Sequence, residues 1–257
     1  HAIEHGYREF IIGIGGSATN DAGLGMLQAL GFRFYDQNGE ILGKGGQILD
    51  QIVAIDFSSV HPALKDARFT IACDVRNPFS GPEGAAYVFA RQKGADGAMI
   101  EKLDAGMKRF SRLIHSTTGR EITEVAGAGA AGGLGGAFLA FLNAELKPGI
   151  ELLLRTLKFD EKIKDADLII TGEGRVDRQS VMGKVPFGIL EEANKQGIPV
   201  IVVAGSIADT EVLNKAGFRG IFSIVPSPMS LEVAMKPEAA KNNISRTVAQ
   251  IISLATL

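Results

Sequence analysis

The chain has 257 residues, of which 32 are glycine, 46% are hydrophobic and 22% are charged. This balance excludes a disordered chain, which would carry fewer apolar residues. The formal charge of −2 excludes the basic surface that nucleic-acid binding needs, and no apolar run approaches the roughly 18 residues of a membrane span. The single cysteine, Cys73, cannot form an internal disulfide, which favours a reducing, cytoplasmic setting.

Short apolar runs rich in β-branched residues alternate with helical patterns, which predicts an α/β fold. In the first part of the chain we expect strands over 10–14, 52–57 and 69–73. An Asn38-Gly39 pair between alternating flanks indicates a hairpin over 32–42. Together these strands predict a mixed sheet.

The helices of this part are marked by their start and stop residues. We expect them over 22–30, 80–91, 97–115 and 136–146. Asn20 or Asp21 can cap the first helix, and Ser80 with Glu83 forms a capping box for the second. The third is amphipathic. The fourth is apolar on most sides and should be buried.

Past residue 160 the pattern becomes a βαβαβ series with tight connections. We expect strands over 168–170, 199–203 and 221–225, and helices over 186–196, 209–215 and 237–257. Parallel pairing with right-handed crossovers follows from this order. We therefore expect two domains, a mixed-sheet α/β domain over 1–160 and part of a Rossmann- or flavodoxin-like parallel-sheet domain over 161–257.

The first of three glycine-rich loops, residues 13–21, joins a predicted strand to a predicted helix. Backbone N–H groups at Gly15 and Gly16 can approach an anion, and the helix N-terminus adds a positive dipole. Further donors and charge come from the side chains of Ser17, Thr19, Asn20 and Asp21. A dinucleotide loop and a plain capped turn stay open as alternatives.

The second loop, residues 127–136, follows a strand-like stretch over 122–125 and matches the G-x-G-x-x-G pattern, with Gly129 and Gly132 as its later glycines. Close packing of a small-residue helix explains it equally well.

The third loop, residues 171–180, directly follows the predicted strand 168–170, at the strand end where open α/β sheets bind ligands. Its candidate site residues are Gly172, Glu173, Gly174, Arg175 and Asp177, with Lys184 further on. A solvated connection is the structural alternative.

Asp74 ends another predicted strand and could meet the other loops at one sheet edge, although an Asx turn is as good an interpretation. The four histidines have no metal-ligand spacing, and a G-x-S-x-G elbow is absent. Glycine loops with carboxylates and cations, without histidine chemistry, suit phosphoryl transfer. The residues alone therefore indicate an ATP- and Mg²⁺-dependent kinase of a small anion.

Three longer segments carry a resemblance to a known family. Residues 12–21, 73–78 and 169–177 closely resemble bacterial type-1 glycerate kinases, and so do the shorter runs 84–86, 92–95 and 127–136. The likeness extends along this whole chain and corresponds to the family from its middle to its C-terminus. It implies two α/β domains, one inserted within the other.

The resemblance implies transfer of the ATP γ-phosphate to D-glycerate, with 2-phosphoglycerate the favoured product. Binding of phosphate or substrate would fall to Gly15, Gly16, Ser17, Thr19, Asn20, Gly129, Gly132, Gly172, Glu173 and Gly174. Catalysis would fall to Asp21, Asp74, Asp177, Arg175 and Lys184, with Asp74 and Asp177 as Mg²⁺ ligands. Which acid is the base stays open.

Family members carry a further segment upstream, so we expect the Rossmann-like domain to be truncated at its N-terminus. Two alternatives to an active kinase stay open. One is a catalytically silent anion-binding fragment, and the other is an NAD-dependent dehydrogenase that would bind NAD through residues 13–18. As binding partners we expect glycerate and ATP, and we expect neither nucleic acid nor a membrane. Whether the chain forms a homodimer stays open.

Overall fold

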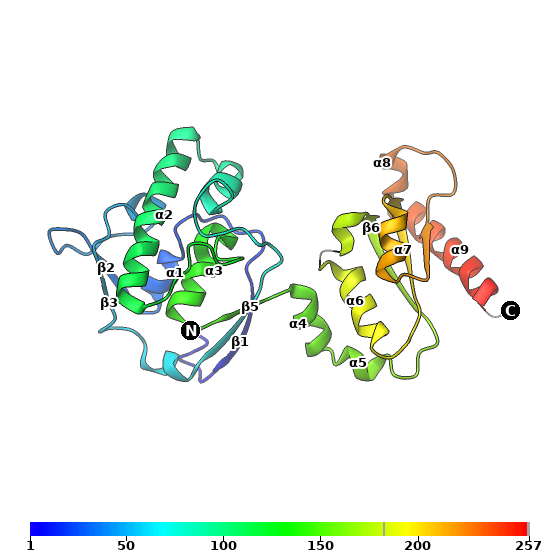
Figure 1. Cartoon of the computed structure of the whole chain (residues 1–257), viewed down its shortest axis with the longest axis horizontal. Helices are drawn as coiled ribbons and strands as arrows, with labels where there is room; N and C mark the ends of the chain where they lie inside the picture. Colours follow the sequence, from blue (N-terminus) through cyan, green and yellow to red (C-terminus); the bar gives the residue numbers. More distant parts are fainter. Residues whose placement is uncertain (182, 256–257) are drawn as a thin grey trace. The chain divides into compact units, whose positions relative to one another are not determined.

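The computed structural model describes residues 1–181 and 183–255. It divides into two compact units, unit 1 (His1–Gly149) and unit 2 (Ile150–Leu257) (Figure 1). The contact boundary thus falls before residue 160, because the segment after Gly149 packs with unit 2. Ile150 fills the space beside Gly188, where an added Cβ would lie 2.5 Å from its Cγ1 atom. Gln196 also donates a hydrogen bond of 2.8 Å to the carbonyl oxygen of Asp160.

Unit 1 contains a parallel sheet and a separate antiparallel pair. In the sheet, β4 (Arg68–Ala72) lies between β1 (Glu9–Gly13) and β5 (Glu145–Lys147). The pair consists of β2 (Arg33–Tyr35) and β3 (Ala54–Asp56). Alternating apolar residues suit these half-buried strands. The expected α/β class is confirmed, with parallel and antiparallel pairing in different sheets.

The Asn38-Gly39 turn forms, but its flanks pair through a single bridge between Tyr35 and Ile41. The Asp36 carboxylate holds the turn by accepting hydrogen bonds from the backbone N–H groups of Asn38 and Glu40. Strand β2 forms its longer pairing with β3 instead. A distant strand therefore replaces most of the predicted hairpin ladder.

The helices of unit 1 are α1 (Leu24–Ala29), α2 (Gly97–Thr118) and α3 (Ala130–Phe141). Single turns of 3-10 helix occur at Gly46–Ile48, Pro62–Asp66 and Arg91–Lys93, and a π-helical turn at Ala86–Ala90. The prediction for α2 is confirmed. The Asp96 carboxylate caps it by accepting from the N–H of Met99, and Gly119 ends it in the left-handed conformation.

Other local predictions were wrong in detail. Ser80 caps no helix, because its hydroxyl is buried without a hydrogen-bond partner in the described part of the chain. The predicted helix over 136–146 ends at Phe141 and is preceded by a kink in which Ala131, Gly132 and Gly133 have positive φ values, and Glu145–Lys147 pairs with β4 as strand β5. Residues 122–125 form turns rather than a strand. For residues 145–147 the pairing with β4, distant in sequence, decides the conformation.

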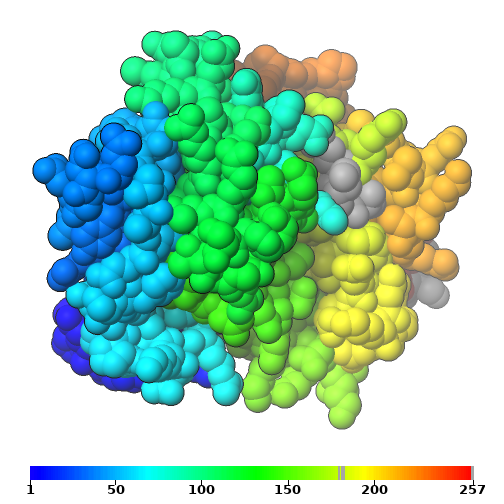
Figure 2. Space-filling model, turned by 60° about the vertical axis from the view of Figure 1, so that its left-hand side comes forward, coloured from blue at the N-terminus to red at the C-terminus, as the bar shows by residue number. Residues whose placement is uncertain are grey.

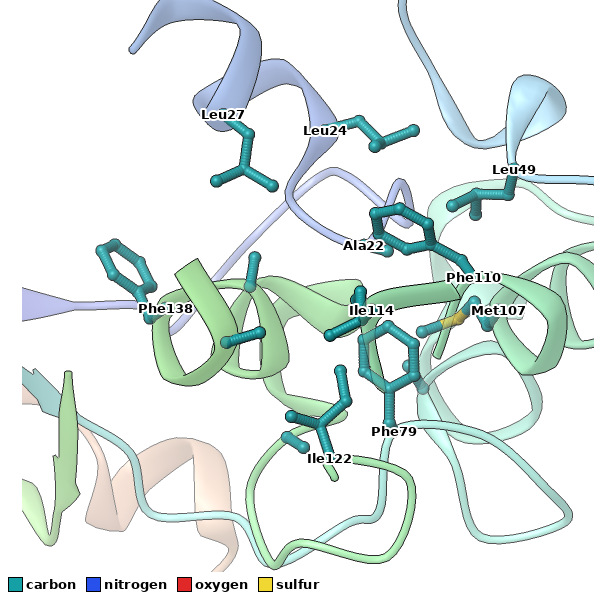
Figure 3. Close-up of a cluster of buried hydrophobic side chains, with 14 of the residues drawn as sticks. Ala22, Leu24, Leu27, Leu49, Phe79, Met107, Phe110, Ile114, Ile122 and Phe138 are labelled. Atoms are coloured by element: carbon teal, nitrogen blue, oxygen red, sulfur yellow. The ribbon is translucent and has the colours of Figure 1, made fainter. Parts of the chain in front are cut away.

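The core of unit 1 gathers large side chains from α1, α2, α3 and the loops around them (Figure 3). Two glycines of α3 let the helix approach this core closely. A Cβ on Gly136 would lie 2.6 Å from Cδ2 of Phe79, and one on Gly133 would lie 2.7 Å from Cε of Met107. Much of the small-residue tract therefore serves packing.

Unit 2 carries the elements β6 (Ile169–Val176), α6 (Val185–Asn194), β7 (Val200–Ile207), α7 (Thr210–Ala216), β8 (Gly220–Ser223), α8 (Leu231–Ala234) and α9 (Pro237–Ala255). They are preceded by α4 (Gly149–Thr156) and α5 (Phe159–Lys162), and a 3-10 turn follows β6 at Arg178–Val181. The sheet order is β6-β7-β8, with parallel pairing throughout. The predicted βαβαβ series is confirmed. Val200, Val202, Leu190 and Leu213 lie in its core.

The third predicted loop is largely strand, which corrects the sequence interpretation. Strand β6 continues through residues 171–176, because β7 extends far enough to pair with it up to Val176 opposite Ile207. Glycines permit the close pairing. A Cβ on Gly172 would lie 3.1 Å from the carbonyl oxygen of Val203. The chain leaves the sheet only at Asp177.

No helix within residues 1–181 and 183–255 is long and apolar enough to cross a membrane. The longest, α2, buries one face in unit 1 through Ile100, Met107, Phe110 and Ile114. Its opposite face forms part of the exposed surface, as a band in the green part of the colour scale (Figure 2).

Candidate functional site

A cavity of about 230 Å³ lies at the carboxyl ends of β1 and β4 in unit 1. The first glycine-rich loop lines it with Ile14, Gly15, Gly16 and Ser17. The end of β4 and the start of α3 complete the wall with Ala72, Cys73, Asp74, Val75, Ala130 and Ala131, together with Phe89, Gln92 and Lys93. Several predicted site residues thus meet at the strand ends where open α/β sheets bind ligands.

The loop presents its backbone to this cavity. A Cβ at Gly15 or Gly16 would meet no described atom within 4 Å, so neighbouring protein atoms do not require a glycine at Gly15. Gly16 has a φ of +67°, a conformation that glycine adopts without strain. A loop with open space above its backbone allows an anion to reach the N–H groups.

Lys93 is the site residue that the sequence interpretation missed. Its ammonium donates hydrogen bonds of 2.9 Å to Oγ of Ser17 and 2.6 Å to the carbonyl oxygen of Thr19. Burial lowers the pKa of Lys93, and the nearby Asp21 carboxylate acts in the opposite direction. The signal available in the sequence was the run Gln92-Lys93-Gly94-Ala95, which resembled the family without indicating a role.

Asp21 is buried and its carboxylate binds backbone. One oxygen accepts a 3.0 Å hydrogen bond from the N–H of Gly23 and the other accepts one of 3.0 Å from Gly25. These bonds stabilise the start of α1, whose first helical residue is Leu24. The geometry is that of a structural cap, and a catalytic role for Asp21 stays a prediction.

Asp74 lines the cavity and is exposed. One carboxylate oxygen accepts a 2.8 Å hydrogen bond from the N–H of Gly149. The adjacent Cys73 donates its thiol to the carbonyl oxygen of Val75 at 3.3 Å, and burial raises the pKa of that thiol. Cys73 therefore lines the cavity as an uncharged thiol. Asp74 contributes the negatively charged carboxylate of the cavity lining.

Gly129 and Gly132 serve close backbone packing. A Cβ on Gly129 would lie 2.1 Å from the carbonyl oxygen of Pro78. One on Gly132, whose φ is +70°, would lie 2.2 Å from the carbonyl oxygen of Thr19. The tract thus supports the first loop from behind, and the residues that face the cavity are Ala130 and Ala131.

Thr19 and Asn20, the last two predicted binding residues of the first loop, do not line this cavity. Thr19 offers its carbonyl oxygen to Lys93, and Asn20 lines a neighbouring cavity rather than this one. Asn20 Nδ2 lies 3.7 Å from the sulfur of Met107, while its Oδ1 is buried without a hydrogen-bond partner among the residues described.

A second group of predicted site residues lies along β6 and just beyond it in unit 2. Arg175 Nε donates to the Asp177 carboxylate at 3.1 Å, and the Lys184 ammonium lies 4.0 Å from Oε1 of Glu173. Gly174 lies between Glu173 and Arg175 in the strand, and Gly172 precedes them. The other carboxylate oxygen of Glu173 is buried without a hydrogen-bond partner in residues 1–181 and 183–255.

Beside this group lies an ion pair that sequence reasoning did not single out. The Arg178 guanidinium donates to both carboxylate oxygens of Asp209, at 3.1 and 2.9 Å. These hydrogen bonds lower the pKa of Asp209 to about 2. The pair ties the turn after β6 to the start of α7.

Among the described residues, no group of three or more His, Cys, Asp and Glu side chains could hold a metal ion. Proteins commonly bind Mg²⁺ through one or two carboxylates together with substrate phosphates. Asp74, which exposes a carboxylate in the cavity, fits that mode of binding.

Comparisons with known proteins agree on one family. The model of the glycerate kinase family matches residues 1–256. A glycerate kinase from Halalkalibacterium halodurans is 46% identical over 250 residues, and the glycerate 2-kinase of Escherichia coli K12 is 46% identical over 246 residues. Each alignment covers 95% of this chain. A crystal structure from Salmonella typhimurium LT2, provisionally assigned as glycerate kinase 2, superposes with a TM-score of 0.81 at 41% identity.

The chain spans about two thirds of the length of these relatives. It covers 66% of the H. halodurans protein, 64% of the E. coli protein and 67% of the S. typhimurium chain, and the last superposition includes all of this chain.

Proposed function

Because the chain belongs to the glycerate kinase family, we propose that it takes part in ATP-dependent phosphorylation of D-glycerate, with 2-phosphoglycerate as the product. The observation that carries this proposal is the cavity at the ends of β1 and β4. There the partly buried ammonium of Lys93 and the open backbone of Gly15 and Gly16 lie at the same cavity as the Asp74 carboxylate. Phosphoryl transfer needs this combination of cradled anion, cation and carboxylate.

In this proposal the anion of the substrate or the phosphoryl group binds the N–H groups of Gly15 and Gly16. The Ser17 hydroxyl, which accepts one N–H of Lys93, is free to turn its own proton toward the anion. Lys93 adds positive charge in a partly buried place, where electrostatic interactions are stronger than in water. These donors stabilise charge that builds up on the transferring oxygens.

Asp74 is proposed as the Mg²⁺ ligand or as the acceptor of the glycerate hydroxyl proton. Mg²⁺, when bound, would supply neutralisation of the phosphate charge. Because the N–H of Gly149 already occupies one oxygen of Asp74, the carboxylate is held in one orientation. Asp21, with both oxygens on backbone N–H groups, has less capacity for either role.

The charged residues at the end of β6 are proposed as a second set of ligands. Arg175 and Lys184 would neutralise charge on the nucleotide or product, and Asp177 would serve as a further Mg²⁺ ligand. Glu173 would serve as a further ligand of the substrate. Gly172 and Gly174 have no side chains, so they would let a ligand approach the backbone of β6 closely.

A coupled assay of ADP release by the purified chain tests the proposal. We expect release that requires D-glycerate, ATP and Mg²⁺ together, and ³¹P NMR should identify 2-phosphoglycerate. ADP release that is independent of glycerate, or absent while ATP binds, would contradict the proposed activity of this chain.

The second candidate is an anion-binding fragment without turnover. It is favoured by one observation, that the chain spans about two thirds of the length of its relatives. Calorimetry with ATP and glycerate distinguishes the two, because the fragment binds at least one of them and releases no ADP.

Two further proposals concern the setting of the protein. We propose that the chain forms a homodimer, which light scattering of the purified chain tests. We also propose a cytoplasmic location, because the single cysteine, Cys73, is a free thiol.

A further inference from the structure

A second cavity of about 340 Å³ opens in unit 1 beside the one just described. Its walls come from the end of the first loop, the Gly46–Ile48 turn, the segment 90–95 and the first turns of α2. The lining residues are Ala18, Asn20, Gly46, Gln47, Ala90, Lys93, Gly94, Ala95, Met99, Lys102 and Leu103. The volume lies within the range of about 300–1,000 Å³ that is common for small-molecule sites.

The chemistry of this cavity differs from that of its neighbour. Apolar atoms of Ala18, Ala95, Met99 and Leu103 form much of its surface, and no carboxylate belongs to its lining within the described chain. Met99 is 55% exposed, although it is a large apolar residue. An apolar wall with an adaptable thioether suits a flat, uncharged group, and the side chains of Lys93 and Lys102 also line the cavity.

Polar groups are present at defined places around these walls. The amide of Asn20 has a buried Oδ1 without a hydrogen-bond partner among the described residues, and the Gln47 amide lies at the same cavity. A buried acceptor of this kind is unfavourable until a donor reaches it.

Lys93 connects the two cavities, because it lines both of them. Its ammonium is bound to Ser17 and Thr19, in the part of the loop that separates the two spaces. A ligand with an uncharged end in one cavity and an anionic end in the other would pass this cation. A nucleoside triphosphate has that shape and distribution of charge.

We propose that the 340 Å³ cavity binds the nucleoside part of the phosphoryl donor, with its phosphates directed past Lys93 toward Gly15 and Gly16. The proposal rests on the function proposed above and assigns one subsite of it. Met99 forms the mouth of the subsite, and Asn20 lies in its wall.

The substitution Met99→Glu tests this assignment. Met99 lies in the first turn of α2, where a carboxylate is compatible with the helix dipole, so the fold should tolerate the change. The matched control is Ala98→Glu, which adds the same charge one residue earlier, at an exposed position outside the cavity lining. We expect Met99→Glu to raise the KM for ATP by about tenfold or more while the KM for glycerate stays the same. Ala98→Glu should leave both constants unchanged.

Oxidation of methionine provides a second measurement that needs no variant. With dilute peroxide and peptide mass spectrometry, we expect AMP and ATP to slow sulfoxide formation at Met99 severalfold. Inorganic tripolyphosphate should not slow it. Met235, 70% exposed and in unit 2, is the internal control and should react at one rate throughout.

The outcomes separate this inference from the proposed activity. An unchanged KM for ATP in Met99→Glu, or equal oxidation of Met99 with and without AMP, overturns the nucleoside subsite even if glycerate is phosphorylated. Protection of Met99 by AMP in a chain that releases no ADP with glycerate supports the subsite and rejects the activity.

Discussion

The ammonium of Lys93 lies 2.6 Å from the carbonyl oxygen of Thr19, although 74 residues separate the two in the chain. The same ammonium donates to the hydroxyl of Ser17. A single cation thus fixes the end of the glycine-rich loop and brings positive charge to its binding face. Charge-assisted hydrogen bonds of this kind are stronger than neutral ones.

Replacing Lys93 by methionine keeps most of the side-chain volume and removes the charge. We expect kcat/KM for phosphorylation to fall by about 100-fold or more, as for the loss of a preorganised donor at a transition-state anion. Steady-state kinetics of Lys93→Met measure this. Lys65→Met, at an exposed position of a 3-10 helix, is the control and should match the unmodified chain. Equal kinetics in both variants would remove Lys93 from the mechanism.

The carboxylates of Asp74 and Asp21 should respond differently to substitution. Asp74→Asn retains an oxygen for the N–H of Gly149 but loses the negative charge, so we expect a fall in kcat of about 100-fold or more at an unchanged melting temperature. Asp66→Asn, at an exposed position, is the control. Normal turnover by Asp74→Asn would exclude both roles proposed for this carboxylate.

Asp21→Ala removes two backbone hydrogen bonds at the start of α1. We expect a loss of about 1–2 kcal/mol in the free energy of unfolding, the usual range for a lost helix cap. Urea denaturation measures it. A variant of full stability with no turnover would instead show that Asp21 acts in the chemistry.

Gly132→Ala tests the close packing behind the loop. The new Cβ would lie 2.2 Å from the carbonyl oxygen of Thr19, at a φ of +70°. We expect the free energy of unfolding to fall by about 1–3 kcal/mol, from backbone strain and overpacking together. Gly97→Ala, at the start of α2 with no described atom within 4 Å of the new Cβ, should be neutral or stabilising by about 0.4–1 kcal/mol. Similar denaturation curves for the two variants would contradict this account of Gly132.

The pairing of Arg178 with Asp209 predicts a pH dependence. Its hydrogen bonds lower the pKa of Asp209 from 3.8 to about 2. Because the folded value is the lower one, the carboxylate stabilises the fold fully above pH 3.8, and the effect is lost as the pH falls through about 2. NMR titration of the Asp209 carboxyl carbon measures the folded pKa. Arg178→Ala should return it toward 3.8, and identical titrations in the two proteins would show that the pair does not form.

The sequence predicted the elements that local patterns determine. Helix α2 was expected over 97–115 because its apolar residues recur at helical spacing, and the structure adds the capping Asp96 and the terminating Gly119. The parallel series from β6 to β8 was expected from alternating strand and helix patterns. The first glycine loop was placed correctly at the end of β1. Each of these features depends mainly on neighbouring residues.

Other features depended on partners far away in the chain. Glu145 and Leu146 were predicted as helical, and they lie in strand β5 because the edge of β4 is available for pairing. Residues 171–176 looked like a binding loop, and they stay in β6 because β7 is long enough to pair with them. Gly129 and Gly132 were predicted as phosphate ligands, and the structure adds that their Cβ positions are blocked by Pro78 and Thr19; their binding role stays a prediction.

By itself the sequence determined the α/β class, the glycine-rich loop at the first strand end and the resemblance to glycerate kinases, because these are properties of composition, local periodicity and residue order. Only the tertiary structure decided which groups share a cavity. Lys93 joins Ser17 and Asp74 there because β1, β4 and the segment 90–95 converge in space. Burial and close approach between segments distant in sequence, which no local pattern encodes, decide which glycines have open space above their backbone and which are tightly packed.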